Sequence, residues 1–307
     1  MVKDHGETLL RTAAIFPGQG SEYSGMLSGI RKSPVTVEVF SRIDHVAKRD
    51  LLEAALAHTD HRLSDPVVSQ LSVFGASACY WQLLRKQEDF RCVAGHSLGF
   101  YAALYASGAV TLEDCAAIII HVQKAIESIS GGRTGLMASI MGLPTEQVEE
   151  ICAELDDVYV SNVNSATQTV ISGWKDAVQS ACSMALEDGA LSVKELPIAY
   201  PLHSPLMHGI EDMIRQAVAM LRIREPEVPV ISHINGDVLQ SEDIAGVLTA
   251  QLTQKVLWKD TVKTIRQKGI NRFVEVGPSD VLSKLVRWIE RDAESFRAEE
   301  LVPCPTL

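Results

Sequence analysis

The feature of this sequence that most clearly predicts a catalytic residue is a serine between glycines at the end of a short apolar segment. Residues Gly95–Gly99 read G-H-S-L-G, so Ser97 lies in a G-x-S-x-G pattern. The apolar residues Cys92–Ala94 precede it and an alanine-rich stretch follows, which predicts a sharp turn from a strand into a helix. A serine on such a turn exposes its hydroxyl beside unpaired helix N–H groups and can act as a nucleophile. The alternative is a serine that only caps the helix.

A serine hydroxyl needs a neighbouring base to attack a carbonyl at neutral pH. Of the nine histidines, we favour His203, because prolines hold the backbone on both sides of it in Pro197–Met207. Until further support is given, a purely structural histidine is the alternative for His203.

Strands and helices must position these two residues. Thr12–Phe16 is predicted to be a strand that breaks into the glycine-rich turn Pro17–Ser21. Asp65 and Pro66 predict the start of a helix whose apolar residues recur at steps of three and four, so we expect it to bury one stripe. Thr111 predicts the cap of another helix, and the tail after Phe296 is expected to be irregular.

The middle of the chain predicts a separate small unit. Strands are expected at 136–141, 158–163, 169–171 and 191–196, and helices at 145–155 and 175–187, which gives the βαββαβ order of a ferredoxin-like unit. Strand-like segments resume at Val228–Ile234 and Arg272–Val276. We therefore expect an α/β fold with a large domain (1–133 and 198–307) that carries an inserted subdomain (134–197).

The composition excludes several classes of protein. The 307 residues are 46% hydrophobic with a formal net charge of −11, which disfavours nucleic acid as the main partner. The six cysteines form no metal-binding spacing and are expected to be reduced and mostly buried. No signal peptide and no apolar run of membrane-spanning length is recognised, so a cytoplasmic protein is expected, without a metal or a resident cofactor.

Four motifs together resemble one family. Phe16–Ser21 (F-P-G-Q-G-S), Gly95–Gly99, His203 and Glu275–Pro278 (E-V-G-P) occur in the order and approximate spacing of malonyl-CoA:acyl carrier protein transacylases, which include polyketide synthase acyltransferase domains. The resemblance implies an α/β-hydrolase-like large domain with a parallel sheet and a ferredoxin-like subdomain. It also implies a pathway of polyketide biosynthesis and, as partners, acyl carrier protein and possible acyl-CoA.

The resemblance also implies roles for single residues. Ser97 would be the nucleophile and His203 the general base and acid, and the backbone carbonyl of Gln251 would orient the imidazole. The backbone N–H groups of Gln19 and Leu98 would form the oxyanion hole. Further residues are expected to border the substrate, namely His96, Phe100, Gln123 and Tyr200.

The sequence departs from the malonyl-transferring members at three places. Their carboxylate-binding arginine falls on Gln123, and the adjacent Lys124 is expected to point about 100° away on a helix. Phe100 stands where many relatives have glutamate, and it either adds apolar area near the site or only packs in the core. Tyr200–His203 matches neither of the usual forms of the stretch that is associated with the choice of extender unit. A neutral amide cannot replace a guanidinium, so uncharged acyl groups are favoured.

Three functions remain open. The first is hydrolysis of non-carboxylated acyl groups from carrier proteins, as in discrete acyl hydrolases of trans-acyltransferase pathways, which this chain resembles. The second is transfer of a non-malonyl or malonyl group between CoA or carrier protein and carrier protein, and the third is a carrier-binding module without catalysis. Lys255–Arg297 holds ten basic and six acidic residues, against the sign of the whole chain, and is either a docking face for an acidic carrier or a set of solvated helix faces.

Overall fold

Strand β1 (Thr12–Phe16) is buried along its whole length and pairs in parallel on both sides, with β2 and β9. It lies near the centre of a six-stranded sheet in the order β10-β9-β1-β2-β7-β8, parallel except for the β7–β8 pair. The computed structural model describes residues 11–23, 25–56, 65–129 and 132–302. The other strands of this sheet are β2 (Phe90–Gly95), β7 (Val230–Ile231), β8 (Val238–Leu239), β9 (Arg272–Glu275) and β10 (Glu294–Arg297).

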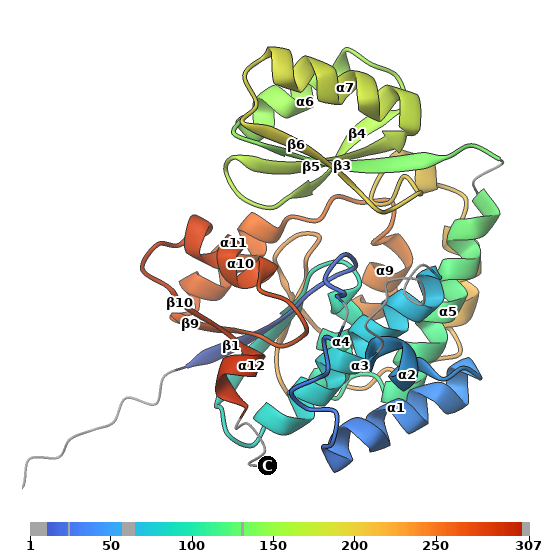
Figure 1. Cartoon of the computed structure of the whole chain (residues 1–307), viewed down its shortest axis with the longest axis vertical. Helices are drawn as coiled ribbons and strands as arrows, with labels where there is room; N and C mark the ends of the chain where they lie inside the picture. Colours follow the sequence, from blue (N-terminus) through green and yellow to red (C-terminus); the bar gives the residue numbers. More distant parts are fainter. Residues whose placement is uncertain (1–10, 24, 57–64, 130–131, 303–307) are drawn as a thin grey trace, which may run out of the picture.

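Helices cover both faces of the large sheet (Figure 1). The side chains of β1 alternate between the two faces: Ala14 and Phe16 belong to the larger core, and Ala13 and Ile15 to the smaller one. The smaller core is closed by α10 (Trp258–Gln267) and α11 (Val281–Ile289). Helices with residues in the larger core are α1 (Pro34–Ala47), α2 (Leu51–Leu56), α3 (Pro66–Leu84), α4 (Gly99–Ala106), α5 (Leu112–Ile129), α8 (Glu211–Val218), α9 (Ser241–Ala250) and α12 (Ala298–Leu301).

Helix α3 begins as predicted but is buried differently. The Asp65 carboxylate accepts hydrogen bonds from the backbone N–H groups of Val67 and Val68 (2.9 and 3.1 Å), which caps the helix. The expectation that α3 buries a single stripe was wrong, because it is packed among α1, α2, α4, α5 and α12 and is buried on nearly all sides. Its buried serines and alanines have small side chains, which allow neighbouring helices to pack closely around it.

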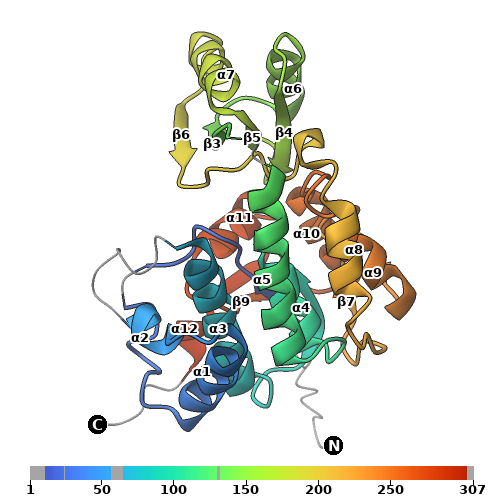
Figure 2. The same ribbon diagram turned by 90° about the vertical axis from the view of Figure 1, so that its right-hand side faces the viewer.

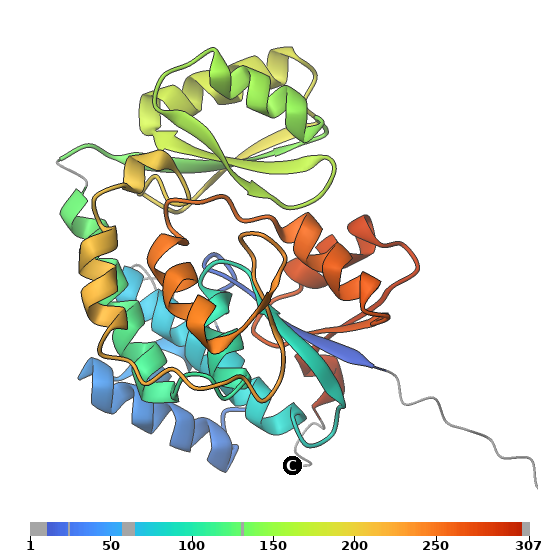
Figure 3. The same ribbon diagram turned by 180° about the vertical axis from the view of Figure 1, so that it is seen from behind.

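The second sheet has four antiparallel strands in the order β4-β5-β3-β6, which confirms the ferredoxin-like unit. Its elements are β3 (Gly135–Met141), α6 (Thr145–Ala153), β4 (Val158–Val163), β5 (Gln168–Trp174), α7 (Lys175–Glu187) and β6 (Ser192–Leu196). Helices α6 and α7 cover its outer face, and its other face looks toward the large sheet (Figures 1 and 3). The long helix α5 runs up to this unit and leads into β3 (Figure 2).

Two segments near the carboxyl end differ from expectation. The strand expected at Val228–Ile234 shortens to Val230–Ile231, and the tail after Phe296 is not irregular, because α12 follows β10 directly. That helix forms because Glu300 accepts the backbone N–H of Arg297 (2.9 Å) and Ala298 enters the core. The described cysteines are free thiols, mostly buried, whereas Cys304 and the extreme termini lie outside the described residues. No helix in the described ranges has both the length and the apolar character that crossing a bilayer requires.

Candidate active site

Ser97 lies at the tip of the sharp turn between β2 and α4. Its backbone has a left-handed φ of 52°, which is strained for a residue with a side chain. Glycines allow the turn: a Cβ on Gly95 would lie 2.1 Å from the carbonyl carbon of Gly99, and one on Gly99 would lie 2.1 Å from the Phe16 carbonyl oxygen. The His96 backbone N–H donates to the same Phe16 oxygen at 2.9 Å. The end of β1 therefore fixes the serine turn.

His203 meets Ser97 from a segment 106 residues further along the chain. Its Nε2 atom lies 2.7 Å from the Ser97 hydroxyl, and the imidazole is only 2% exposed. The segment from β6 returns to the large domain just before it, through a tight turn in which the Ser204 hydroxyl donates to the Pro201 carbonyl at 2.6 Å. His203 also has a left-handed φ, of 57°. Both partners are thus held by constrained turns.

The other nitrogen of His203 faces two backbone carbonyls. Nδ1 lies 2.7 Å from the Gln251 oxygen and 3.2 Å from the Gln254 oxygen. A carbonyl only accepts hydrogen bonds, so Nδ1 carries the proton and Nε2 is left to accept one from Ser97. Burial lowers the pKa of His203 to about 4, against the opposing effect of the carbonyl contacts. The imidazole is therefore neutral at physiological pH.

The side chain of Gln251 ties this carbonyl to the helix that follows Ser97. Gln251 follows the last residue of α9, and its Nε2 donates to the Tyr101 hydroxyl on α4 at 2.9 Å. Both side chains are buried. The sequence resemblance pointed to Gln251 but offered no reason to expect Gln254 or Tyr101.

Two backbone N–H groups beside Ser97 are available to a substrate. Leu98 directly precedes α4, and Gln19 lies in the glycine-rich turn after β1. Within the described residues, neither backbone N–H donates a hydrogen bond to another backbone group. Both residues border the same small cavity as Ser97. The resemblance assigns these two N–H groups to the oxyanion hole, and that role stays a prediction.

A cleft of about 350 Å³ opens in front of Ser97 and His203. One wall comes from the large domain and the other from the inner face of the small sheet. Lys194 on β6 is the one lysine or arginine among its described lining residues, and it is exposed. The lining residues from the small sheet are Met137, Ser139, Met141, Asn162, Gln168, Val170, Ser192, Lys194 and Leu196.

A smaller cavity of about 30 Å³ also borders Ser97. Its polar lining consists of the amides of Gln19, Gln70 and Gln251 with the Tyr101 hydroxyl, and no described lysine, arginine, aspartate or glutamate borders it. Its apolar lining consists of Leu98, Ile119, Val122, Ile126, Leu202 and Leu252. We call it the acyl cavity.

Gln123 does not border the acyl cavity but contacts Gln70, which does. It is 1% exposed, accepts a hydrogen bond from Gln70 Nε2 (2.9 Å) and donates to Glu127 (2.9 Å). Lys124 is exposed, which confirms that it points away from Gln123 on the helix. Tyr200 is half-buried and lies close to Gln123 and Glu127, and neither Gln123 nor Tyr200 borders the described cleft or cavity directly.

Phe100 corrects an expectation. It was expected to border the substrate, but it is fully buried, borders neither the cleft nor the acyl cavity, and packs edge-on against the ring of His233 with centroids 4.9 Å apart. It points into the core because α4 turns that face away from Ser97. His96, in contrast, borders the cleft, with Nε2 held 3.0 Å from the side-chain oxygen of Asn164.

Two site neighbours carried no sequence signal. His233 is fully buried with its ring 6.5 Å from that of His203, and neither of its ring nitrogens has a partner among the described residues. Burial lowers its pKa far below the ordinary value. Asn164 comes from the small subdomain and reaches His96 across the cleft. Only the folded chain brings either residue near Ser97.

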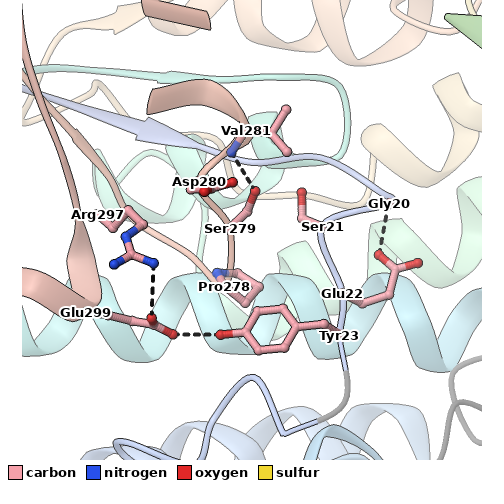
Figure 4. A pocket seen from close by; sticks show the side chains of 10 residues that line it. All are labelled: Gly20, Ser21, Glu22, Tyr23, Pro278, Ser279, Asp280, Val281, Arg297 and Glu299. Carbon is pink, nitrogen blue, oxygen red and sulfur yellow. Dashed lines mark hydrogen bonds and ion pairs between the residues drawn. The ribbon is translucent and has the colours of Figure 1, made fainter. Parts of the chain in front are cut away.

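A second hollow of about 350 Å³ adjoins the cleft and shares Gly20, Ser21 and Val281 with it (Figure 4). Its one described cation, Arg297, pairs with Glu299 and Glu300, and Glu299 also accepts the Tyr23 hydroxyl at 2.7 Å. With Glu22 and Asp280 also in its wall, this hollow has excess negative charge. It is therefore a poor site for an anion.

The E-V-G-P motif is structural. The Glu275 carboxylate is buried and accepts the backbone N–H of Ser283 at 2.7 Å near the start of α11. Burial raises its pKa above the ordinary value. Gly277 lies against Pro17, so the motif supports the turn that carries Gln19.

This fold and site define a class of protein, in which a parallel α/β sheet presents a strand–turn–helix serine to a histidine held by a backbone carbonyl. The family model for the acyl transferase domain matches residues 14–305. The chain belongs to this family.

The relatives are transacylases and a polyketide biosynthesis protein. The chain is 31% identical to ThaF, a polyketide biosynthesis protein of Burkholderia thailandensis, over 90% of its own length but only 24% of that of ThaF. It is 32% identical to PksC of Bacillus subtilis, a polyketide biosynthesis malonyl CoA-acyl carrier protein transacylase, over 92% of the chain and 98% of PksC. The solved malonyl CoA-acyl carrier protein transacylase of Coxiella burnetii superposes with a TM-score of 0.91 and 32% identity over 95% of this chain and 96% of that one.

Proposed function

We propose that this chain is a serine acyl-enzyme that takes short uncharged acyl groups from thioesters of acyl carrier protein, or of CoA, and releases them by hydrolysis. The observation that carries this proposal is the Ser97–His203 pair, with 2.7 Å between the hydroxyl and Nε2 and with Nδ1 held by the Gln251 carbonyl. A carrier-binding module without catalysis would need neither the pair nor its strained turns.

The chemistry follows from the protonation states. Ser97 Oγ attacks the thioester carbonyl and gives its proton to His203 Nε2. The carbonyl oxygen becomes an oxyanion that the free backbone N–H groups of Gln19 and Leu98 would bind. The C–S bond then breaks, and the leaving thiolate takes the proton from His203, which leaves an acyl ester on Ser97. Water attacks this ester with His203 as the base, and the acid is released with Ser97 regenerated.

The acyl carrier protein is proposed as the partner because PksC and the Coxiella burnetii enzyme are named for it. The basic span 255–297 is consistent with docking of an acidic carrier, although half of its ten basic residues form ion pairs. Lys259 and Lys263, on α10, form no described ion pair and are the first residues to substitute when docking is measured.

The acyl cavity supports an uncharged acyl group. A carboxylate placed there would find no described cation, and burying an unpaired charge costs on the order of several kcal/mol. The cavity of about 30 Å³ accommodates a methyl-sized group or one water molecule with amide partners. Hydrolysis is proposed ahead of transfer to a thiol because the chain resembles discrete acyl hydrolases, with glutamine, here Gln123, in place of the carboxylate-binding arginine.

The test is mass spectrometry of the intact protein after incubation with acetyl- and malonyl-CoA. We expect an acetyl adduct on Ser97 that decays within the assay without an acceptor thiol, and no such adduct in Ser97→Ala. A stable malonyl adduct would contradict the proposed acyl preference, and an acetyl adduct that persists until holo carrier protein is added would contradict hydrolysis.

A second candidate is malonyl transfer. It is favoured by the names of the relatives and by Lys194, the one lysine or arginine among the described residues that line the cleft. If Lys194 holds a malonyl carboxylate, Lys194→Met should abolish malonyl adducts and leave acetyl adducts unaffected.

A further inference from the structure

A chain of amide side chains runs from the turn beside Ser97 to the end of α5. Gln70 Nε2 lies 3.4 Å from Gln19 Oε1 and 2.9 Å from Gln123 Oε1, and Gln123 Nε2 donates to Glu127 Oε1 at 2.9 Å. Gln19 and Gln70 border the acyl cavity, and Gln123 is buried behind them. Glu127 lies at the exposed end. We call these four residues the amide chain.

Glu127 fixes the direction of every hydrogen bond in the amide chain. An ionised carboxylate only accepts, so the NH₂ group of Gln123 must face Glu127 and its oxygen must face Gln70. Gln70 therefore turns its own NH₂ group toward Gln123 and Gln19. The pKa of the Tyr200 hydroxyl is raised by burial and by the charge of Glu127, and a hydrogen bond with Gln123 opposes this rise. Tyr200 therefore lies beside the Gln123 NH₂ group.

This direction keeps the NH₂ groups of Gln70 and Gln123 turned away from the acyl cavity, so that Gln19 is the one member of the chain with an NH₂ group not engaged within it. The two hydrogens of the Gln70 NH₂ group face Gln123 and Gln19, and those of Gln123 face Glu127 and Tyr200. Gln70 has only its carbonyl oxygen left for an acyl group. A carbonyl oxygen repels a carboxylate and tolerates a methyl group.

We propose that Glu127 is a specificity-determining, positioning residue, which excludes acyl groups with a terminal carboxylate by orienting the amide chain. It touches neither Ser97 nor the cavity, and its exposed charge is screened by solvent, so it acts through hydrogen-bond direction rather than through its field. The inference rests on the proposed function, because it assumes that the acyl group of the Ser97 ester occupies the acyl cavity.

Glu127→Lys tests this inference, because an ammonium group only donates. It should turn the Gln123 oxygen outward and its NH₂ group toward Gln70, so that the Gln70 NH₂ group becomes free to face the cavity. The measurement is the ratio of malonyl to acetyl adduct formation rates on Ser97, with the two CoA thioesters. We expect this ratio to rise about tenfold or more, as a carboxylate gains a donor.

Two controls separate the amide chain from other effects. Glu150→Lys makes the same charge change on the exposed face of α6, and the ratio should stay within about twofold of the wild type. Glu127→Lys combined with Gln123→Glu keeps the new ammonium group but presents an acceptor-only carboxylate to the Gln70 NH₂ group, as in the wild type, so the ratio should return to the wild-type value.

The outcomes distinguish this inference from the proposed function. An unchanged ratio in Glu127→Lys, or an equal rise in the double variant, would overturn the role of Glu127 while acetyl adducts still support the proposed function. A wild-type protein without any adduct on Ser97 would overturn both.

Discussion

Ser97 and His203 each hold a left-handed backbone conformation at the point where their side chains meet, with φ of 52° and 57° and 2.7 Å between hydroxyl and imidazole. Each such angle is unfavourable for a residue with a Cβ and persists only where the surrounding fold imposes it. Here β1, with its glycine turn, imposes one, and the proline-rich return from the small subdomain imposes the other. The contact between the two residues is therefore set by the fold rather than by local preference.

Removing either member of this pair should abolish turnover while leaving the fold intact. Ser97→Ala should leave no acyl adduct, and His203→Ala should lower kcat by about a thousandfold or more, because the hydroxyl loses its base. Turnover with acetyl-CoA and thermal melting check this prediction. Near wild-type turnover in His203→Ala would show that another group activates the serine.

The activity should persist to unusually low pH. Burial lowers the pKa of His203 to about 4, and the base form is the neutral imidazole, so kcat/KM should stay level down to about pH 5 and fall below it. A pH profile of adduct formation in mixed buffers measures this. A fall centred near the ordinary histidine pKa of 6.5 would contradict the neutral, buried state of His203.

The same burial makes stability depend on pH. His96, His203 and His233 all have pKa values below the ordinary 6.5 because they are buried, so the unfolded chain binds more protons than the folded one below that pH. The free energy of unfolding should therefore decrease as the pH falls from 6.5 toward 4. His233→Phe should flatten this decrease, as measured by urea denaturation at pH 7 and pH 5. An equal slope in the variant would mean that His233 titrates normally.

A side chain at Gly95 should be poorly tolerated. A Cβ there would meet the backbone of Gly99 at 2.1 Å, whereas one on Gly29 would meet no atom within 4 Å. Gly95→Ala should cost about 3 kcal/mol or more of stability together with activity, and Gly29→Ala less than about 1 kcal/mol. Chemical denaturation of both variants makes the comparison, and similar losses would show that the serine turn can relax.

The Gln251–Tyr101 hydrogen bond should affect catalysis only by steadying the carbonyl that holds His203. Gln251→Ala and Tyr101→Phe should each lower kcat by about tenfold, far less than His203→Ala, and the double variant should be no worse than the poorer single one, because both remove the same bond. Strictly additive losses would show that the two side chains act separately.

Patterns local in sequence predicted most of the fold and the exposed turn at Ser97, whereas the choice of His203 rested on the order of four motifs along the whole chain. The glycines on both sides of Ser97 favour a sharp turn. The βαββαβ order is visible because segments with strand and helix patterns follow one another in that order. Helix α3 was misjudged because its repeating apolar residues give the same pattern whether one side or all sides are covered. Asn164 and His233 meet site residues across long sequence separations, and the amide chain joins Gln19, Gln70 and Gln123 from three separate parts of the fold, none of which a local pattern encodes.

The division of the cleft between two sheets has a practical consequence. Ser97, His203 and the backbone N–H groups of Gln19 and Leu98 all belong to the large domain, whereas the opposite wall is a strand surface of the inserted unit, which two crossings of the backbone join to the rest. Side chains on β3–β6 that line the cleft can therefore be exchanged as a group to change which thioester enters, while Ser97 and His203 keep their positions.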